Sequence, residues 1–257
     1  MTKPKALVMY GDGINCDAET EFGLQLAGFN PNRVHTSELL TNPKSLNDCK
    51  LLVFPGGFSF GDEIASGKVL ALELKQRVNE ALHQFIDNNG FVLGICNGFQ
   101  VLVQLGILPI SRQGSPRIVS LTRNSAGKFI NKWVTLSVAG EKACFFFDGL
   151  KNIDLPIRHG EGRLSLGAHP DKDVVMTVSR HTVLRYREDI NGSFEKAAAL
   201  TNENGNVLGL MPHPEAFVRW SQHPGWPELN LKASQSEDAN ETPHGLAILQ
   251  NAFRAVN

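Results

Sequence analysis

A cysteine between two closely spaced glycines is the sharpest local feature of the chain. The sequence G-I-C-N-G, residues 94–98, joins the apolar run Phe91–Ile95 to the helical pattern Asn97–Leu105. A strand that turns directly into a helix at a cysteine presents the sulfur at the turn, and glycines are needed where neighbouring backbone crowds it. Free N–H groups at the start of the helix favour the thiolate. We therefore predict that Cys96 is a nucleophile and that the Asn97 N–H can bind an oxyanion; the alternative is a buried, inert cysteine.

A histidine late in the chain is the best placed to act as the proton shuttle that a thiolate needs. The sequence M-P-H-P-E, residues 211–215, follows the apolar run Val207–Met211. Proline stiffens this segment and prevents the strand from continuing. His213 and Glu215 are two residues apart, so in an extended segment they project to the same side, and the carboxylate can orient the imidazole. This pattern predicts a triad with Cys96; the alternative is a surface histidine beside an unrelated glutamate.

Two further motifs contain residues suited to binding. F-P-G-G-F-S-F-G-D, residues 54–62, follows a second apolar run, and its glycines can offer backbone N–H groups to an oxyanion. This loop lacks the P-loop pattern, so phosphate binding is disfavoured, and a plain turn is the alternative. P-I-R-H-G-E-G-R, residues 156–163, either lines a polar pocket or forms a charged surface turn. His159 in this motif is the main competitor to His213 as the catalytic base.

The elements around these motifs alternate between short apolar runs and helical patterns. Such alternation predicts an α/β domain with a mostly parallel central sheet flanked by helices. The predicted strands are Lys5–Tyr10, Leu51–Pro55, Phe91–Ile95 and Val207–Met211. The predicted helices are Asp17–Ala27, Ile64–Asn89, Asn97–Leu105 and a last helix from Pro243. Asp17 is the predicted N-cap of the first helix and Gly28 its stop, and the second helix is predicted to break near Ser66-Gly67 and to end at Gly90. Thr242 is the predicted N-cap of the last helix.

The middle of the chain has a different pattern, with strands separated by turns. It predicts additional antiparallel strands at the sheet edge, formed by Trp133–Val138, Cys144–Phe147, Val174–Ser179 and Thr182–Tyr186.

We interpret residues 1–257 as a single domain. Residues 217–241 are irregular and polar, and we interpret them as a surface excursion because they are long for a loop in a compact domain.

Composition sets broad limits on function. The chain has 257 residues, 42% hydrophobic and 20% charged, with a formal net charge of -1, so no basic excess indicates a nucleic-acid surface. No apolar run reaches about 18 residues, and the apolar run near the N-terminus is too short for a signal peptide. We therefore expect no membrane association and a cytoplasmic location. The four cysteines are widely spaced without a C-x-x-C pair, so no metal site is predicted.

Together, the four motifs resemble those of class I, triad-type glutamine amidotransferases. More narrowly, they are similar to the glutaminase subunits of phosphoribosylformylglycinamidine synthase in four blocks that occur in the family's order: G-G-F-S-F-G-D (56–62), G-I-C-N-G-F-Q (94–100), H-G-E-G-R (159–163) and M-P-H-P-E (211–215). The second and fourth blocks are typical of the superfamily, while the first and third narrow the resemblance to this family. The similarity covers nearly the whole chain and implies a flavodoxin-like class I glutamine amidotransferase fold.

The resemblance implies a role for each motif residue. Cys96 would attack the carboxamide of L-glutamine to form a γ-glutamyl thioester, with His213 as general acid and base and Glu215 orienting it. The oxyanion would lie between the N–H of Asn97 and that of Gly57 or its neighbour. By analogy with the superfamily, the residues expected around the substrate glutamine are Gly56, Phe58, Gln100, His159, Gly160 and Glu161.

The resemblance also implies partners. Ammonia would pass to a large ATP-using synthetase subunit (PurL-type), which converts formylglycinamide ribonucleotide to formylglycinamidine ribonucleotide, and a small subunit (PurS-type) would bridge the two. This chain has no ATP-site motif, so ATP and Mg are expected in the synthetase and no cofactor is expected here. The alternatives are a glutaminase subunit for another synthetase, a cysteine peptidase or chaperone-like relative, which the asparagine after Cys96 disfavours, and an inactive scaffold, which the intact triad disfavours.

Overall fold

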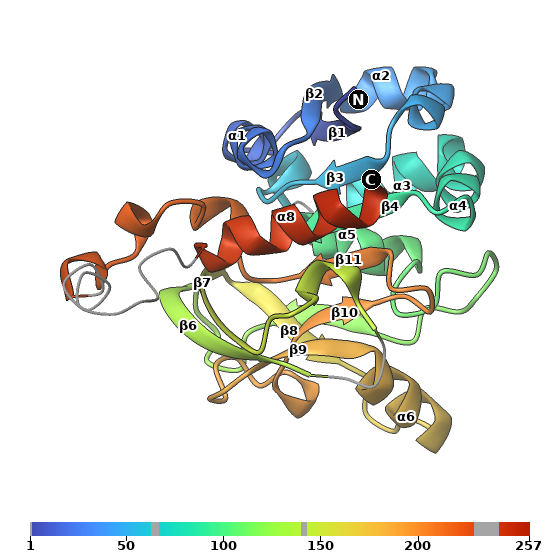
Figure 1. Cartoon of the computed structure of the whole chain (residues 1–257). Coiled ribbons are helices and arrows are strands. Elements are labelled where there is room, and N and C mark those ends of the chain that lie inside the picture. The colour runs from blue at the N-terminus through green and yellow to red at the C-terminus, as the bar shows by residue number, and fades with distance from the viewer. Residues whose placement is uncertain (1, 63–66, 140–142, 229–241) are drawn as a thin grey trace.

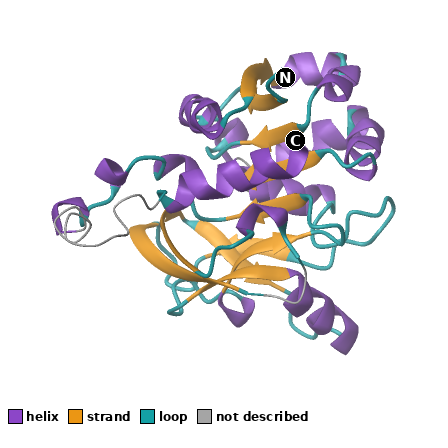
Figure 2. Cartoon of the chain, viewed as in Figure 1, coloured by secondary structure: helices purple, strands orange, loops and turns teal. Residues whose placement is uncertain are grey.

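A nine-stranded sheet runs through the centre of the protein, as the computed structural model shows (Figure 1). The structure describes residues 2–62, 67–139, 143–228 and 242–257. The strand order is β2-β1-β3-β4-β11-β10-β9-β6-β7, and a separate two-stranded sheet pairs β5 with β8. Figure 2 shows the strands as a layer with helices around it. The predicted α/β fold with a central sheet flanked by helices and additional antiparallel strands is confirmed, but the sheet is mixed and not mostly parallel.

The first five strands in this order are parallel, and we call them the parallel half. They are β2 (Asn30–His35), β1 (Lys5–Tyr10), β3 (Leu51–Phe54), β4 (Phe91–Ile95) and β11 (Val207–Leu210). The strands β3, β4 and β11 are buried along their whole length, because helices cover both faces. Their carboxyl ends meet at one edge, and the glycine-rich loop, the cysteine turn and the M-P-H-P-E segment all begin there.

The remaining strands are antiparallel, and we call them, together with the two-stranded sheet, the antiparallel region. They are β10 (Ala197–Thr201), β9 (Thr182–Tyr186), β6 (Ile130–Val138), β7 (Asn152–His159), β5 (Ser120–Arg123) and β8 (Glu161–Ser165). Although β7 is last in the strand order, it contacts the 214–216 segment and the C-terminal helix. The antiparallel region therefore returns to the edge where the parallel strands end.

Helices cover the parallel half on both faces (Figure 1). On one face, α1 (Asp17–Ala27) packs against α8 (His244–Val256). On the other, α5 (Asn97–Leu105) packs against α3 (Lys68–Arg77) and against β3, β4 and β11. The shorter α2 (Thr36–Thr41) and α4 (Asn79–Asp87) complete this part, and α6 (Lys172–His181) contacts β9 and β10. Among the described residues, no helix is both long and apolar enough to span a bilayer.

Two of the predicted strands are wrong. Phe145–Phe147 forms a single 3-10 turn, in which Phe146 and Phe147 are buried, instead of a strand. The run Val174–Ser179 lies inside α6, which buries Val178 and His181 on one face. β-branched residues disfavour a helix only slightly, so tertiary packing can override them.

Some predicted helix caps and helix ends also differ from those of the structure. Cys16, and not Asp17, is the N-cap of α1, while Gly28 ends that helix in the left-handed conformation as predicted. The predicted Ile64–Asn89 helix consists of α3 and α4, which are separated at Val78; its residues 64–66 lie outside the described residues. Asn89, and not Gly90, takes the positive φ (62°) after α4.

The C-terminal helix begins one residue later than predicted. Its N-cap is Pro243, and the first helical residue is His244, so Thr242 is not the cap. In the preceding segment, Phe217 and Val218 are buried, and residues 229–241 lie outside the described residues. The surface excursion over residues 217–241 therefore stays a prediction for its later part, and its first two residues belong to the core.

Candidate active site

Cys96 occupies a strained turn between β4 and α5. Its backbone has φ 50° and ψ -103°, a conformation that costs a non-glycine residue about 1–3 kcal/mol. Its N–H donates to Leu210 O at 2.8 Å, which fixes the turn to β11. A Cβ at Gly98 would lie 1.9 Å from Phe54 O, and one at Gly94 would lie 2.8 Å from the Gly98 backbone. The glycines on either side of Cys96 are thus required by close backbone contacts.

The Cys96 side chain is 6% exposed and faces the last strand of the antiparallel region. Its thiol points to the Arg158 carbonyl of β7, with Sγ and O separated by 3.7 Å. A contact of this length is weak, so it orients the thiol without holding it firmly.

The glycine-rich loop lies against the segment that follows β1. Gly56 O accepts from the N–H groups of Asn15 and Cys16 at 3.3 and 3.2 Å, and the Phe58 N–H donates to Gly13 O at 2.7 Å. Gly57 has φ 153°, and a Cβ on it would lie 2.5 Å from Gly13 O. Among the described residues, the Gly57 N–H has no hydrogen-bond acceptor.

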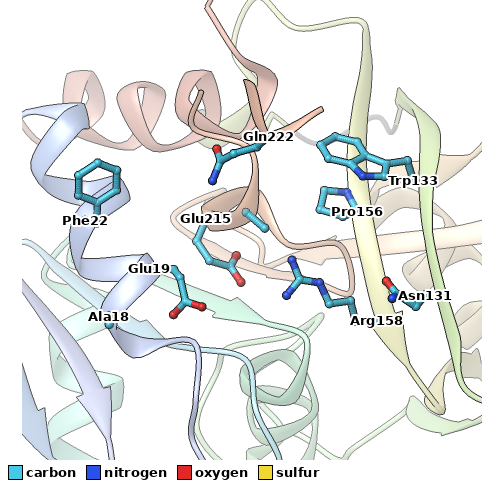
Figure 3. Close-up of a pocket in the computed structure, with 10 residues that line it drawn as sticks. Ala18, Glu19, Phe22, Asn131, Trp133, Pro156, Arg158, Glu215 and Gln222 are labelled. Carbon is cyan, nitrogen blue, oxygen red and sulfur yellow. The ribbon is translucent and has the colours of Figure 1, made fainter. Parts of the chain in front are cut away.

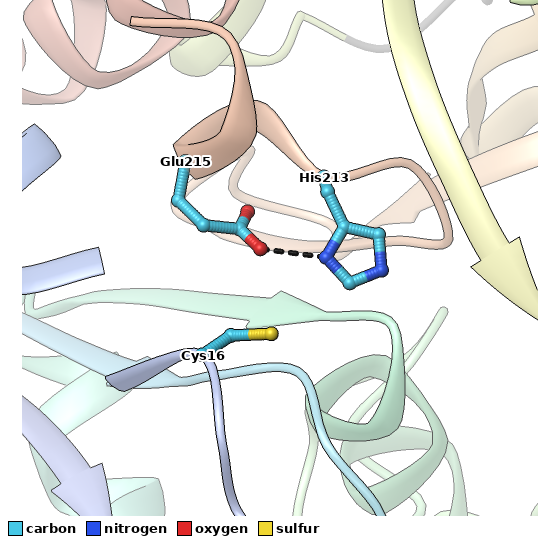
Figure 4. Close-up of side chains that lie close together, drawn as sticks. All are labelled: Cys16, His213 and Glu215. Carbon is cyan, nitrogen blue, oxygen red and sulfur yellow. Dashed lines mark hydrogen bonds and ion pairs between the residues drawn. The ribbon is translucent and has the colours of Figure 1, made fainter. Parts of the chain in front are cut away.

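His213 and Glu215 form a buried ion pair. Nδ1 of His213 lies 2.6 Å from Oε1 of Glu215, and both side chains are only 3% exposed (Figure 4). The His213 N–H donates to Pro156 O at 2.9 Å, so β7 also positions this residue. The predicted pairing is present, but the segment is not extended as expected: Pro214–Ala216 forms a 3-10 turn, and this turn brings Glu215 to the His213 imidazole.

The electrostatic environment favours a charged imidazole. Burial disfavours the imidazolium and is the largest single influence, but the Glu215 carboxylate, Cys96 and the Cys16 thiol together outweigh it. As a result, the pKa of His213 lies well above its usual value. Nε2 of His213 forms no hydrogen bond of ordinary geometry with any described residue, which leaves this nitrogen available for proton transfer.

A chain of side-chain hydrogen bonds connects three of the motifs. Ser59 N–H donates to Oδ1 of Asn97 at 3.2 Å, and Nδ2 of Asn97 donates to Oε1 of Gln100 at 3.1 Å. Nε2 of Gln100 in turn donates to Glu161 O at 2.8 Å. Both ends of the Gln100 amide are therefore used within the protein, and this residue ties the glycine-rich loop and the cysteine turn to β8.

His159 lies in the same region but in a different environment. Its Nδ1 is 3.0 Å from Oδ1 of Asn124, and burial lowers its pKa to about 4, with a smaller contribution from His213. It is therefore neutral near pH 7. Its neighbour Gly160 joins β7 to β8, so the H-G-E-G-R motif spans the end of β7, which pairs with β6, and the start of β8, which pairs with β5, and is not a surface turn.

The structure also brings in residues that the sequence reasoning missed. Cys16, at the N-terminus of α1, places its sulfur beside the His213 imidazole (Figure 4). Tyr186 of β9 is buried with no hydrogen-bond partner for its hydroxyl among the described residues, and burial, with a smaller contribution from Cys96, raises its pKa. A signal for Cys16 does exist: it follows β1, and ligands in α/β folds lie at the carboxyl ends of the strands.

A cavity of about 730 Å³ lies on the Glu215 side of the ion pair. Figure 3 shows the side chains of Glu19, Phe22, Trp133, Arg158, Glu215 and Gln222 around it. Neither Cys96 nor His213 lines this cavity. A ligand bound there would contact the carboxylate and not the sulfur, so the cavity is not where a group attacked by Cys96 would lie.

The fold and the site define a class: an α/β protein with a cysteine at a strand-to-helix turn beside a buried histidine–glutamate pair. A family model for the CobB/CobQ-like glutamine amidotransferase domain matches residues 3–254. The phosphoribosylformylglycinamidine synthase subunit PurQ of Dehalococcoides mccartyi is 38% identical over 99% of this chain and 98% of its own. That of Methanococcus maripaludis is 37% identical, with coverage of 99% and 98%.

Comparison with solved structures gives the same result. A chain in the structure of PurLQS from Thermotoga maritima matches with a TM-score of 0.74 and 33% identity, and 100% of each chain is covered. The chain therefore belongs to the CobB/CobQ-like glutamine amidotransferase family, on the branch of the PurQ subunits of phosphoribosylformylglycinamidine synthase. The resemblance seen in the sequence motifs is confirmed.

Proposed function

We propose that this chain is the glutaminase subunit of a phosphoribosylformylglycinamidine synthase, with Cys96, His213 and Glu215 as its catalytic triad. The observation that carries the proposal is the buried 2.6 Å contact between His213 and Glu215. The imidazole of His213 also interacts with the Cys96 thiol. A nucleophile beside an imidazole that is itself oriented by a carboxylate is the arrangement required for acyl transfer.

In the first step, the Cys96 sulfur attacks the carboxamide carbon of L-glutamine, and His213 holds the proton from the thiol. The carbonyl π electrons move to oxygen and give a tetrahedral intermediate. His213 then donates the proton to the amide nitrogen, and the C–N bond breaks. Ammonia departs, and a γ-glutamyl thioester remains on Cys96. Glu215 stays ionised and stabilises the imidazolium while that proton is held.

The oxyanion of the intermediate needs two N–H donors. The Phe58 N–H is occupied by Gly13 O, whereas the Gly57 N–H has no acceptor among the described residues. These contacts favour the N–H of Gly57 over that of Phe58 as the first oxyanion donor. Asn97 supplies the second N–H because it begins α5 directly after Cys96, where helix N–H groups point outward.

In the second step, water attacks the thioester carbonyl. His213 takes a proton from that water as the new C–O bond forms, and it gives this proton to the Cys96 sulfur as the C–S bond breaks, which releases glutamate and restores the thiol. This role needs a base that accepts a proton near neutral pH. The low pKa of His159, about 4, and its amide partner in place of a carboxylate favour His213 over His159.

The other motif residues have supporting positions. Gln100 connects Asn97 with the Glu161 backbone, so we propose that it shapes the glutamine site by holding these groups in register. Gly56 packs closely under the imidazole, because a Cβ on it would lie 2.8 Å from Cε1 of His213. We propose that the exposed Phe58 and Gly160, between β7 and β8, also lie around the substrate glutamine.

We propose that the released ammonia passes to a PurL-type synthetase, with a PurS-type subunit completing the assembly. The relatives named PurQ and the PurLQS structure of Thermotoga maritima support this assignment. ATP and Mg would act in the synthetase partner. The cytoplasmic location expected from the sequence stays a prediction.

Labelling with 6-diazo-5-oxo-L-norleucine, a glutamine analogue that alkylates attacking thiols, tests the nucleophile. We expect mass spectrometry to find one adduct per chain on the peptide that contains Cys96, and none in Cys96→Ala. The Cys49→Ala protein is the matched control and should be labelled like the parent, because Cys49 is a buried thiol whose pKa is raised to about 12. An adduct that persists in Cys96→Ala would contradict the assignment.

A further inference from the structure

A second thiol lies against the imidazole of His213, and the proposed glutaminase reaction does not use it. Cys16 belongs to the turn between β1 and α1 and is 8% exposed. Its Sγ lies 3.3 Å from Oδ1 of Asn15, and a Cβ placed on Gly56 would lie 3.2 Å from this sulfur and 2.8 Å from Cε1 of His213. Figure 4 shows the sulfur beside the imidazole, close to the His213–Glu215 contact.

Three donor atoms of different chemistry meet at this position. One atom each from Cys16, His213 and Glu215 all lie within 4.8 Å of one another, and all three residues are buried. Within the described part of the chain, no other cluster of three such donors is this compact. Sulfur, imidazole nitrogen and carboxylate oxygen are the zinc ligands of proteins, and Zn–ligand distances of about 2.0–2.3 Å require shifts of only about 1 Å from this arrangement.

The pair also contains an unused coordinating atom. Oε2 of Glu215 is buried and has no hydrogen-bond partner among the described residues, whereas Nδ1 is the His213 nitrogen that faces Glu215. Buried polar atoms without partners are costly. Oε2 can therefore bind a cation while Oε1 faces the imidazole, and this second observation distinguishes the cluster from a lone cysteine.

An entry path reaches the cluster from the surface. The cavity of about 730 Å³ is lined by Glu215 and by Ala18 and Glu19, which follow Cys16 on α1 (Figure 3). Two carboxylates on its wall favour a cation, although Arg158 also lines it. A metal ion can thus approach Glu215 through a cavity that Cys96 does not line.

We infer that Cys16, His213 and Glu215 form a binding site for a thiophilic divalent cation of the Zn²⁺ class, and that an ion bound there inhibits the glutaminase. On binding, the Cys16 thiol and the His213 ring each release one proton to solvent, and no electrons are transferred. The metal then occupies the imidazole that must carry the catalytic proton. The inhibitory part rests on the proposed function, whereas the binding part does not.

Binding is tested without activity, in the full-length Cys96→Ala protein, which lacks the catalytic thiol. Cd²⁺ serves as the probe because thiolate coordination gives an ultraviolet charge-transfer band. We expect a saturable band corresponding to one thiolate per Cd²⁺. It should disappear in Cys96→Ala/Cys16→Ser, where a similar-sized oxygen replaces the sulfur, and persist in Cys96→Ala/Cys49→Ala. Absence of the band in Cys96→Ala, or its full retention after Cys16→Ser, would overturn the site.

Inhibition is tested by titrating Zn²⁺ into the glutaminase assay of the parent and of Cys16→Ser. We expect the half-inhibitory Zn²⁺ concentration to rise at least about tenfold in Cys16→Ser, since one of three ligands is lost. Inhibition of the parent should strengthen as pH rises, because binding releases protons. Equal sensitivity of the two proteins would overturn the inhibitory role. A protein that binds Cd²⁺ but never hydrolyses glutamine would refute the proposed function and leave the site standing.

Discussion

The parallel half and the antiparallel region meet at the active site but supply different kinds of groups to it. The parallel half provides the side chains with chemical function: Cys96 after β4, His213 and Glu215 after β11, and the glycine-rich loop after β3. The antiparallel region provides mainly carbonyl groups, from Pro156, Arg158 and Glu161, that accept hydrogen bonds from these elements.

This difference separates reactivity from positioning. Side chains at the ends of parallel strands lie at fixed positions because those strands are buried on both faces. Backbone carbonyls of β7 and β8 can orient them whatever side chains those strands carry. Substitutions in the parallel half should therefore abolish turnover or folding, while side-chain substitutions in the antiparallel region should have smaller and more indirect effects.

The largest expected effect is that of Cys96→Ala. Without the sulfur no thioester forms, so kcat for glutamate release should fall by more than about 10³-fold, as for other enzymes that lose the nucleophile of a triad. Glutamate release from purified protein measures this loss. Cys49→Ala should retain the parent rate, and a Cys96→Ala protein with more than a tenth of that rate would exclude Cys96 as the nucleophile.

Gly98→Ala and Gly160→Ala compare the two regions directly. A Cβ on Gly98 would lie 1.9 Å from Phe54 O, whereas the nearest atom to one on Gly160 is a Phe129 ring carbon at 3.8 Å. We expect Gly98→Ala to lower the free energy of unfolding by at least about 3 kcal/mol and Gly160→Ala to change it by less than about 1 kcal/mol. Urea denaturation measures both, and equal losses would show that the turn at Cys96 is no more crowded than the connection at Gly160.

Glu215→Gln should be milder than loss of Cys96 or His213, because Glu215 acts through the imidazole. We expect kcat to fall about 10- to 100-fold. Because the carboxylate raises the pKa of His213, the kinetic pKa of the imidazole should move to lower pH in the variant. The pH profile of kcat/KM measures this shift. An unchanged profile would mean that Glu215 does not set the charge of His213.

His159, in the antiparallel region, should affect stability through pH. Its folded pKa of about 4 lies below its usual value of 6.5. Between these values the unfolded chain binds a proton that the folded chain does not, so stability decreases as pH falls through this window. From pH 7 to pH 5 this single group should cost about 2 kcal/mol.

The His159→Gln protein provides the comparison for this pH effect, since glutamine does not titrate. Its free energy of unfolding should depend less on pH between 7 and 5 than that of the parent, by about the same 2 kcal/mol. Urea denaturation at the two pH values measures the difference. If the free energy of unfolding changed with pH by the same amount in both proteins, His159 would not be held neutral in the folded state.

The parallel half was also the part that the sequence predicted best. The predicted bounds of β1, β4, α1 and α5 are those of the structure, because continuous apolar runs and helical periodicity are strong local signals. The edge strand β2 was missed because it contains Pro31 and polar residues, which an edge tolerates. In the antiparallel region β10 was missed, since its alanines have little strand propensity and only burial selects them.

The same contrast holds for the site. Cys96, His213 and Glu215 were found because turn glycines and a two-residue spacing are local patterns. Partners from distant segments were beyond local reasoning: the contact of Cys16 with His213 and the hydrogen bond from Gln100 to Glu161 O join segments far apart in sequence. Such pairs depend on strand order and on the return of β7, which no local pattern specifies.

Coupling between glutaminase turnover and the synthetase tests the central claim most directly. Glutamate release from glutamine is measured for this chain alone, and then with the PurL-type and PurS-type subunits, ATP, Mg and formylglycinamide ribonucleotide. We predict strong stimulation with the full set and formation of formylglycinamidine ribonucleotide, both lost with Cys96→Ala. Glutamine turnover that is the same with and without the full set would contradict the assignment to this synthase, and no turnover under either condition would contradict the glutaminase itself.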